Sequence, residues 1–296
     1  MPPTWTETTL DVPGGVQHTL RVGDDPTDQW HVSIALPPPG LQAFVGPGPF
    51  PALYLLDSSL TFIVAGQIAQ TTWAFSLGQL QPVVVVGISP ATDDFDRLLT
   101  QRNRDLTPTA AVPEHLQGRT PYGTGGAGSM LDLICDVIAP HLESRYPLNP
   151  SDRGLGGLSL GALFTCWALL VRPEGFQRYL AVSPSLWWDA GLLLDQQRLP
   201  AVDRDRSDVY LAVGGCEDDP ARSWPVLTPE MLEAMSGMNM VADAASLADR
   251  LHGQPGIEVR HEVIPEEHHA TVWPAAFTRG LVHLYRTDRQ RPPIDE

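Results

Sequence analysis

The stretch RGLGGLSLGALF, residues 153–164, decides the fold. Its first half, residues 153–158, has the short, glycine-bounded pattern of a β-strand. Residues 160–170 are apolar on nearly every side, which predicts a helix buried under a sheet. Between the two stands Ser159, at the centre of a Gly-x-Ser-x-Gly pattern. The stretch therefore predicts a strand, a sharp turn at a serine, and a buried helix.

A serine in this position is typical of a nucleophile. The turn from strand to helix exposes the hydroxyl in a strained backbone geometry, and glycines two residues before and after it let neighbouring backbone approach. The following helix aims its first N–H groups at the same place, where they can bind a developing oxyanion. The competing interpretation is a glycine-rich turn that matches the pattern by chance. The strand and the helix on either side of Ser159 favour the nucleophile.

Further strands and helices are predicted on both sides of this unit. Short apolar or β-branched runs indicate strands near residues 19–22, 31–36, 52–56, 83–88, 179–182, 209–213 and 258–264. Helical periodicity occurs at residues 62–75, 130–142, 240–251 and 271–285, and Pro140 should kink the second of these. The early strands lack intervening helices, whereas the later strands alternate with helices. This order predicts an α/β fold whose sheet of about eight strands is mostly parallel with an antiparallel start, with helices on both faces.

Two long segments break this rhythm. Residues 92–128 are rich in Pro, Gly and Thr, and residues 218–239 hold several Pro and Met residues. Loops of this length inside a compact domain are usually functional, so we expect substrate-binding or lid segments. The methionines at residues 231–240 suit a deformable cover over an apolar substrate. No linker divides the chain, and we expect a single domain over residues 1–296.

The composition excludes several classes of function. All 19 basic residues are arginine, and 35 acidic residues give a formal net charge of −16. The absence of lysine excludes a Schiff-base lysine, a P-loop lysine and a lysine-rich nucleic-acid arm. So negative a field also argues against nucleic acid and anionic membranes as partners. We see no signal peptide, no apolar run long enough to span a membrane, and no Cys-x-x-Cys pair among three cysteines. We expect a cytoplasmic protein; its oligomeric state is not indicated.

A serine nucleophile needs a histidine base and an acid that orients the base. In sheets of this type the acid follows the serine in the chain and the histidine follows the acid. His268 and His269 lie between the last predicted strand and the last helix, where the base belongs, and position alone does not choose between them. Glu217 comes just past an earlier strand, followed by Asp218 and Asp219. We expect Glu217, the nearest to the strand, to be the acid; a solvated charged turn is the alternative.

Three other features of the chain have patterns found in binding sites. The loop after the strand at residues 52–56 should supply a second oxyanion donor, although it also has the pattern of an ordinary helix cap. Residues 123–128 match G-x-G-x-x-G, but no strand leads into them, so we expect no nucleotide site. A metal site at His268 and His269 is not expected, because the side chains of adjacent residues diverge and no other residues have the spacing of metal ligands. We therefore expect no metal and no cofactor.

With these motifs in place, the chain resembles the esterase family of α/β-hydrolases that contains the enterochelin and siderophore esterases and is related to esterase D and the mycolyltransferases. The matching stretches are YLLDSS at 54–59, RDLTPT at 104–109, IAPHLESRYPLNPSDRGLGGLSLGALF at 138–164, GFQRYLAVSPSLWWD at 175–189, LAVGGCEDD at 211–219 and IPEEHHATV at 264–272. The resemblance covers most of the chain in the right order. It implies an α/β-hydrolase fold and ester cleavage through an acyl-enzyme.

The resemblance also implies a role for individual residues. Ser159 matches the nucleophile, and Glu217 matches the acid in a Gly-x-x-Glu pattern. His269 matches the base, because the family reads His-x-Ser-Val where this chain reads HATV at residues 269–272. This match favours His269 over His268.

The oxyanion donors implied by the resemblance are backbone N–H groups. They belong to Leu160 and to Ser59 or its neighbour Ser58. The chain departs from the family at two positions that usually hold glycine, which are Ser58 and Glu266. The first departure bears on the geometry of the oxyanion hole.

Substrate contacts are expected from arginine and tryptophan side chains. Arg102 and Arg104 suit planar, bidentate recognition of an acidic or catecholate substrate, and a structural ion pair with Asp105 or Asp96 is the alternative. Trp187 and Trp188 follow a strand and are expected to wall the acyl pocket; packing in the core is the competing account.

The sequence thus predicts a serine carboxylic-ester hydrolase that acts on a small-molecule ester, of siderophore type or aryl type. An acyltransferase with the same triad is one alternative, and a non-catalytic binding protein with a hydrolase fold is another. If the two arginines are not available at the site, a neutral ester is favoured.

Overall fold

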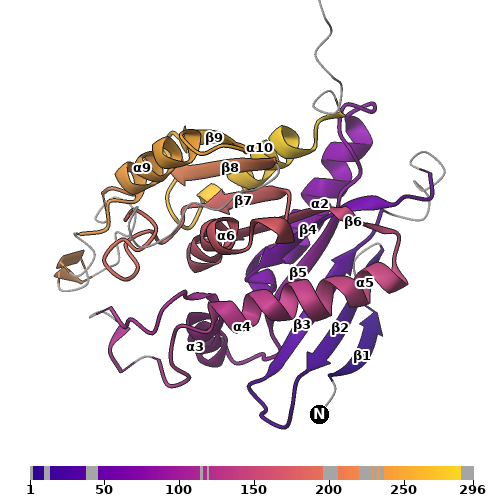
Figure 1. The fold of residues 1–296 in the computed structure, drawn as a ribbon, viewed down its shortest axis with the longest axis horizontal. Coiled ribbons are helices and arrows are strands. Elements are labelled where there is room, and N and C mark those ends of the chain that lie inside the picture. The colour runs from indigo at the N-terminus through magenta and orange to yellow at the C-terminus, as the bar shows by residue number, and fades with distance from the viewer. Residues whose placement is uncertain are drawn as a thin grey trace, which may run out of the picture.

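The computed structural model describes residues 3–9, 14–37, 46–113, 116–118, 120–195, 206–219, 228–229, 232–233 and 237–287. Within this part of the chain, nine strands form one sheet in the order β1-β2-β3-β5-β4-β6-β7-β8-β9. Figure 1 shows the sheet running from the indigo strands of the N-terminal region to the orange strands β8 and β9.

The elements have the following bounds. The strands are β1 (Thr4–Thr9), β2 (Gly15–Arg21), β3 (Gln29–Ala35), β4 (Phe50–Leu56), β5 (Val84–Pro90), β6 (Leu148–Leu158), β7 (Arg178–Val182), β8 (Ser207–Gly214) and β9 (Ile257–Ile264). The helices are α2 (Ser58–Phe75), α3 (Phe95–Leu106), α4 (Ala127–Asp132), the π-helix η3 (Leu133–Ile138), α5 (Ala139–Arg145), α6 (Leu160–Val171), the short 3₁₀ turn η4 (Pro173–Gly175), α9 (Met240–His252) and α10 (Val272–Tyr285).

The predicted sheet architecture is confirmed. β1, β2, β3 and β5 pair antiparallel, and every pairing from β5 through β4 to β9 is parallel. The described part of the chain has one strand more than the eight that the sequence predicts, and this additional strand is β1. Its sequence, TWTETT, has one large apolar side chain and otherwise polar residues. Such a pattern suits an edge strand that pairs on one side only, and it carries little hydrophobic signal.

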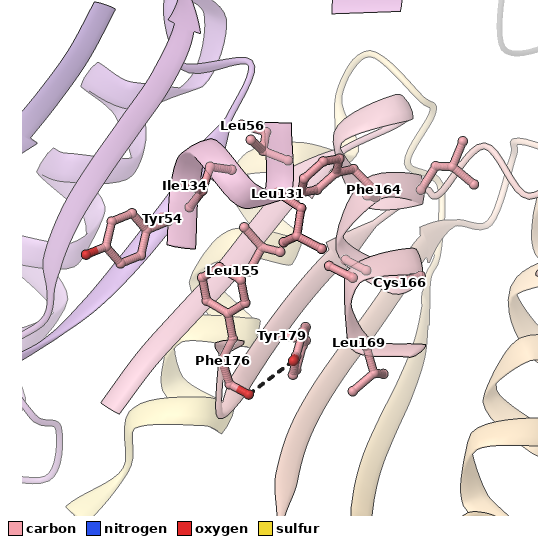
Figure 2. Close-up of a cluster of buried hydrophobic side chains, with 14 of the residues drawn as sticks. Tyr54, Leu56, Leu131, Ile134, Leu155, Phe164, Cys166, Leu169, Phe176 and Tyr179 are labelled. Atoms are coloured by element: carbon pink, nitrogen blue, oxygen red, sulfur yellow. Dashed lines mark hydrogen bonds between the residues drawn. The ribbon is translucent and has the colours of Figure 1, made fainter. Parts of the chain in front are cut away.

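Helices cover both faces of the sheet. α2 and α10 lie on one face, where Phe62 and Phe277 are buried with strand residues such as Leu53. α6, the helical segments from α4 to α5, and α9 lie on the other face. Figure 2 shows part of that second layer, in which Phe164 and Leu155 are among the buried side chains and the Tyr179 hydroxyl donates to the carbonyl of Phe176. Each such fully buried side chain stabilises the fold by roughly 1.5–3 kcal/mol.

The expected kink at Pro140 takes the form of a π-helical segment. α4, η3 and α5 are continuous from residue 127 to residue 145, and Pro140 lies at the start of α5. A proline has no N–H to donate and its ring crowds the preceding turn. The wider turn of η3, just before Pro140, accommodates both effects without breaking the helix.

The prediction of a loop over residues 92–128 is wrong in part, because α3 lies inside it. Asp94 caps α3 by accepting a hydrogen bond from the N–H of Arg97 at 3.0 Å. The buried face of α3 includes polar side chains such as Gln101 and Asp105. A search for apolar periodicity cannot find a helix whose buried face is polar. The other predicted loop, 218–239, lies mostly outside the described residues.

Candidate active site

Ser159 occupies the turn between β6 and α6 that its sequence context predicts. Its φ of 60° and ψ of −117° are unusual for any residue other than glycine. The surrounding structure must hold such a conformation in place, and conformations of this kind cluster at functional sites. The Ser159 N–H donates to the carbonyl of Val182 at 3.0 Å, which fixes the turn against the end of β7.

The flanking glycines are required by close backbone contacts. A Cβ atom on Gly157 would lie 2.6 Å from the carbonyl carbon of Gly161, so the strand and the first turn of α6 touch directly. A Cβ atom on Gly161 would lie 3.2 Å from Oδ2 of Asp57 and 3.3 Å from Cβ of Leu56. The start of α6 therefore packs against the residues that lead into α2.

The carboxylate of Glu217 faces the imidazole of His269. His269 Nδ1 and Glu217 Oε2 are 2.7 Å apart. The Glu217 side chain is 1% exposed and the His269 side chain 23% exposed, so the pair is shielded on the acid side and open on the histidine side. Of the two adjacent histidines, the structure brings His269 to the acid.

Two further donors hold the other oxygen of Glu217. The N–H of Gly214 donates to Oε1 at 2.7 Å, and the hydroxyl of Ser183 donates to it at 2.5 Å. Glu217 is thus fixed at both oxygens, with Oε2 left for His269. Its neighbour Asp218 is used differently, because its carboxylate accepts from the N–H of Val241 at 2.8 Å.

The loop that carries His269 is docked onto the turn that carries Glu217. Cys216 N–H donates to the carbonyl of Glu267 at 3.0 Å, and Gly215 N–H donates to the carbonyl of Ile264 at 2.8 Å. Ser159, Glu217 and His269 follow β6, β8 and β9, whose parallel strands all end at the same edge of the sheet. Ligand chemistry in open α/β sheets collects at this edge.

The candidate oxyanion donors lie at the starts of α6 and α2. The first N–H groups of a helix have no partner within that helix, and Leu160 is the first residue of α6. At the start of α2, the N–H of Leu60 donates to the carbonyl of Asp57 at 3.0 Å. The backbone N–H groups of Ser58 and Ser59 are therefore the candidates on this helix.

Of the two departures from the family pattern, the structure makes room for Ser58 and holds Glu266 in a backbone conformation that favours glycine. Ser58 is buried, and a Cβ atom added to Gly87 would lie 2.6 Å from Cβ of Ser58. The missing side chain at Gly87 thus makes room for the one present at Ser58. Glu266 has a φ of 64°, in the left-handed region that favours glycine.

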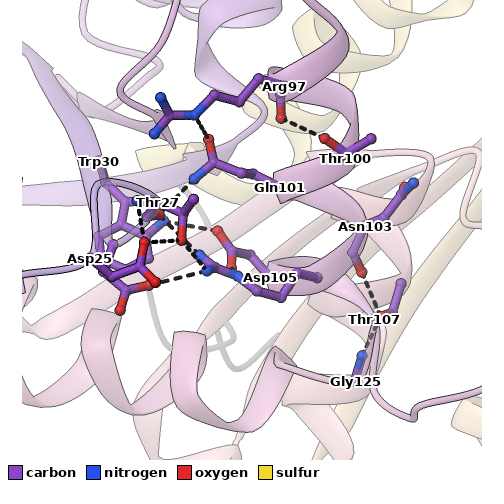
Figure 3. A network of polar contacts seen from close by, with 12 residues as sticks. Asp25, Thr27, Trp30, Arg97, Thr100, Gln101, Asn103, Asp105, Thr107 and Gly125 are labelled. Atoms are coloured by element: carbon purple, nitrogen blue, oxygen red, sulfur yellow. Dashed lines mark hydrogen bonds and ion pairs between the residues drawn. The ribbon is translucent and has the colours of Figure 1, made fainter. Parts of the chain in front are cut away.

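The two arginines predicted to contact substrate are held by carboxylates. Arg102 donates to both oxygens of Asp57, and Arg104 pairs with Asp105 and Asp28. The alternative of a structural pair with Asp105 thus describes where Arg104 lies. Figure 3 shows the network around Asp105, which also accepts from Trp30 Nε1 at 2.9 Å. Burial raises the pKa of the Asp105 carboxyl, while the donors Arg104 and Trp30 oppose this shift.

The two tryptophans differ in exposure. Trp188 is fully buried in the core, and its Nε1 donates to the hydroxyl of Thr109 at 3.0 Å. Trp188 therefore packs in the core, which was the alternative to walling the acyl pocket, and its hydrogen bond also attaches the segment after α3. Trp187 is partly buried, and its ring lies 6.1 Å from that of Trp188.

Two glycines of the stretch at residues 123–128, Gly125 and Gly126, pack against α3 and the segment that follows it. Cβ atoms on Gly125 and Gly126 would lie 2.7 Å and 2.8 Å from backbone atoms of Ala110 and Arg104. The N–H of Gly125 donates to the Thr107 hydroxyl (Figure 3), and the N–H of Gly126 donates to the carbonyl of Arg104. These N–H groups are engaged within the protein instead of forming a phosphate cradle.

Sequence reasoning missed Ser183 and Ser185. Both lie in the turn after β7, where the Ser183 hydroxyl contacts Glu217 and the Ser185 hydroxyl lies 3.2 Å from Oγ of Ser159. The stretch GFQRYLAVSPSLWWD contains them, but nothing in one sequence separates these serines from ordinary turn residues. Among the described residues there is no group of three or more His, Cys, Asp or Glu side chains suited to a metal ion. In the same part of the chain, no helix combines the length and apolarity needed to cross a bilayer.

The chain is similar in sequence and in structure to known esterases and hydrolases. In sequence, the chain is 27% identical over 295 residues to the siderophore triacetylfusarinine C esterase of Aspergillus fumigatus, covering 94% of this chain and 95% of that protein. It is 28% identical over 267 residues to the ferri-bacillibactin esterase BesA of Bacillus subtilis, covering 85% and 83%. In structure, it resembles the siderophore hydrolase EstA from Aspergillus nidulans with a TM-score of 0.76 and 23% identity, covering 95% and 98%. The last likeness supports the fold.

The family assignment rests on a match to most of the chain. The family model described as "Putative esterase" matches residues 25–284, a span that begins before β3 and ends in α10. That span includes Ser159, Glu217 and His269. The chain therefore belongs to the "Putative esterase" family, with a mostly parallel sheet of the α/β-hydrolase type.

Proposed function

We propose that this protein is a serine ester hydrolase in which Ser159 is the nucleophile, His269 the base and Glu217 the acid that orients the base. The observation that carries the proposal is the 2.7 Å contact between Glu217 and His269 Nδ1 at the sheet edge where Ser159 is held in a strained turn. Glu217 accepts the Nδ1 proton, which leaves Nε2 as the basic nitrogen.

The proposed reaction has two halves. Nε2 of His269 removes the hydroxyl proton of Ser159 as Oγ attacks the ester carbonyl carbon, and the carbonyl oxygen becomes an oxyanion. The backbone N–H groups of Leu160 and of Ser59 or Ser58 stabilise that charge. The intermediate collapses, and the alcohol leaves with the proton from His269. Water then attacks the acyl-enzyme with His269 as base, which releases the acid and restores Ser159.

For the substrate, we propose a small-molecule ester of siderophore type. The support comes from two relatives that match most of the chain, one named a siderophore triacetylfusarinine C esterase and the other a ferri-bacillibactin esterase. Arg102 and Arg104 are engaged by carboxylates, and the formal net charge of the chain is −16. Both observations favour an ester of low charge over a polyanionic one. A single domain over residues 1–296 and a cytoplasmic location stay predictions from the sequence.

Labelling with a fluorophosphonate probe tests the nucleophile. The wild type should gain the mass of one phosphonyl group, and Ser159→Ala should gain none. Absence of labelling on the folded wild type would contradict the proposal and favour a binding protein. Hydrolysis of p-nitrophenyl esters of graded chain length, beside a ferric hydroxamate and a ferric catecholate siderophore, then defines the substrate. Product analysis with added alcohols distinguishes transfer from hydrolysis.

A further inference from the structure

The turn at residues 183–185 lies between the proposed nucleophile and the proposed acid. β7 lies between β6 and β8 in the sheet, so the turn after β7 stands between the turns that carry Ser159 and Glu217. Backbone hydrogen bonds attach it on both sides. Ser183 N–H donates to the carbonyl of Ala212 at 2.7 Å, and Ser185 N–H donates to the carbonyl of Ser159 at 3.2 Å.

Each serine of the turn directs its hydroxyl to one end of the proposed triad. Ser183 Oγ is 2.5 Å from Oε1 of Glu217, and Ser185 Oγ is 3.2 Å from Oγ of Ser159. Ser183 is fully buried and Ser185 is 1% exposed, so bulk water does not compete for these hydrogen bonds. Ser183 also has a φ of 48°. This conformation is costly for serine, and the backbone bonds of the turn maintain it.

The chemistry of the partners fixes the direction of the Ser183 hydrogen bond at rest and that of the Ser185 hydrogen bond during the reaction. An ionised carboxylate only accepts, so Ser183 is the donor to Glu217. Either hydroxyl can donate between Ser185 and Ser159 at rest. In the reaction the Ser159 proton moves to His269, so the Ser185 hydroxyl must then be the donor to Ser159 Oγ. A hydrogen bond to an oxygen that gains negative charge becomes shorter and stronger.

We propose that the Ser183–Pro184–Ser185 turn is part of the catalytic apparatus, with Ser185 donating to the nucleophilic oxygen and Ser183 positioning the acid. Ser185 keeps its own proton throughout, and the proton of Ser159 still passes to His269 and then to the leaving alcohol. Ser183 takes up Oε1 of Glu217, so that Oε2 stays directed at His269. This proposal rests on the proposed esterase function of the same site.

The test compares Ser183→Ala and Ser185→Ala with Ser207→Ala. Ser207 is also a buried serine, but it lies at the opposite end of β8. The rate of p-nitrophenyl acetate hydrolysis and the rate of fluorophosphonate labelling are measured from pH 5 to 9. The hydrolysis rate is divided by the amount of enzyme that the probe labels at completion. Ser185→Ala should lower kcat/KM and the labelling rate together by about 10- to 100-fold, because one donor to the reacting oxygen is lost. Ser207→Ala should leave both rates at the wild-type level.

Ser183→Ala should change the pH profile as well as the rate. Without the Ser183 hydroxyl, the Glu217 carboxylate has one donor fewer and attracts a proton on His269 more strongly. The acidic limb of kcat/KM should therefore move to higher pH, by roughly half a unit or more. A residue that only supports the fold would lower the amount of active enzyme and leave the pH profile unchanged.

The outcomes separate this proposal from the proposed function. Suppose that the wild type is labelled and active, that Ser185→Ala has wild-type rates, and that the pH profile of Ser183→Ala is unchanged. This result would overturn the proposed role of the turn and leave the proposed esterase function supported. A wild type that is neither labelled nor active would overturn both. If Ser185→Ala does not fold, Ser185→Cys fills the same space with a much weaker donor and should show the same loss of rate.

Discussion

Arg102 donates two parallel hydrogen bonds to Asp57, from Nε to Oδ1 at 2.8 Å and from Nη2 to Oδ2 at 2.7 Å. Asp57 immediately precedes α2 and has a φ of 56°. Its Oδ2 also lies 3.2 Å from the position of a Cβ atom on Gly161, at the start of α6. The ion pair between Arg102 of α3 and Asp57 thus lies next to the starts of α2 and α6, the two helices that are proposed to bind the oxyanion.

Replacing Arg102 with glutamine should destabilise the fold and impair turnover. Asp57 is 8% exposed, and a buried carboxylate left without its partner costs about 3–5 kcal/mol. The free energy of unfolding in urea should fall by this amount. In the folded fraction, kcat should fall more than KM rises, because the start of α2 shifts while the rest of the site stays.

Arg145→Gln is the matched control for this change. Arg145 also pairs with a carboxylate, that of Glu7 at 3.2 Å, but the two side chains are 51% and 50% exposed. An exposed pair contributes less than about 1 kcal/mol. Equal losses of stability in the two variants would show that burial of the Asp57–Arg102 pair has no special role.

Glu217→Gln should lower kcat by about 10⁴-fold while the fold stays intact. Gly214 and Ser183 both donate to Oε1, so the amide oxygen of the new side chain must take that place. Its NH₂ group then faces His269 Nδ1 and forces that nitrogen to accept. The proton of the imidazole moves to Nε2, which can no longer remove a proton from Ser159.

The neighbouring carboxylate provides the control for Glu217→Gln. Asp218→Asn removes a charge one residue away, where the side chain accepts from the backbone of Val241. We expect kcat within a few-fold of wild type. Wild-type kcat in Glu217→Gln together with a large loss in Asp218→Asn would assign the acid to Asp218.

Two glycine-to-alanine changes should have opposite effects on stability. A Cβ atom on Gly157 would lie 2.6 Å from backbone of Gly161, so Gly157→Ala should cost about 2 kcal/mol or more and abolish activity. Gly128 lies within α4, and a Cβ atom there would meet nothing within 4 Å. Gly128→Ala should raise the free energy of unfolding by about 0.5–1 kcal/mol. Thermal and urea unfolding measure both, and a stable Gly157→Ala enzyme would contradict the close contact.

Acidification should destabilise the fold in part through His18. Burial lowers the pKa of His18 below its ordinary value of 6.5, an effect that Glu7 opposes. Nε2 of His18 lies 2.8 Å from the hydroxyl of Tyr146. Because the unfolded chain then binds a proton more readily than the folded one, this contribution is complete above about pH 6.5 and is lost as the pH falls through the lowered value.

The measurement compares wild type with His18→Gln. Urea unfolding at pH 7.5 and at pH 5.5 should show a larger loss of stability in the wild type than in the variant. His31, His141 and His261 also have pKa values lowered by burial, so some loss should persist. If the free energy of unfolding falls equally in both proteins between pH 7.5 and pH 5.5, His18 does not contribute to the acid sensitivity.

The parts of the fold that follow from apolar patterning were predictable from the sequence. α6 carries a continuous apolar signal after Ser159, the end of β6 has the short glycine-bounded pattern of a strand, and the antiparallel start of the sheet shows in the early strands. β1 and α3 were not predicted because their stabilising contacts are polar or lie at an edge. Trp30 and Asp105, for example, meet through a hydrogen bond between residues 75 positions apart.

The candidate site divides in the same way. Ser159, Glu217 and His269 follow strands, so strand order and the resemblance to a family were enough to nominate them. The partners of Arg102 could not be predicted, because Asp57 lies 45 positions away and no local pattern joins them. Ser183 and Ser185 become visible only when the sheet places β7 between its two neighbours.

The contact between Ser58 and Gly87 has a consequence for the order in which substitutions can accumulate. The two positions share one volume, since a Cβ atom on Gly87 would lie 2.6 Å from that of Ser58. Ser58→Gly removes one of the two contacts that exclude a side chain at Gly87. The other is with Phe62, whose Cδ2 would lie 2.7 Å from the same Cβ atom, so Phe62 must also give way before Gly87→Ala fits. The reverse order passes through a protein with two colliding Cβ atoms inside its core. An evolving lineage that moves the side chain from the start of α2 to β5 must therefore change Ser58 and make room at Phe62 before it changes Gly87, although another order would end at the same protein.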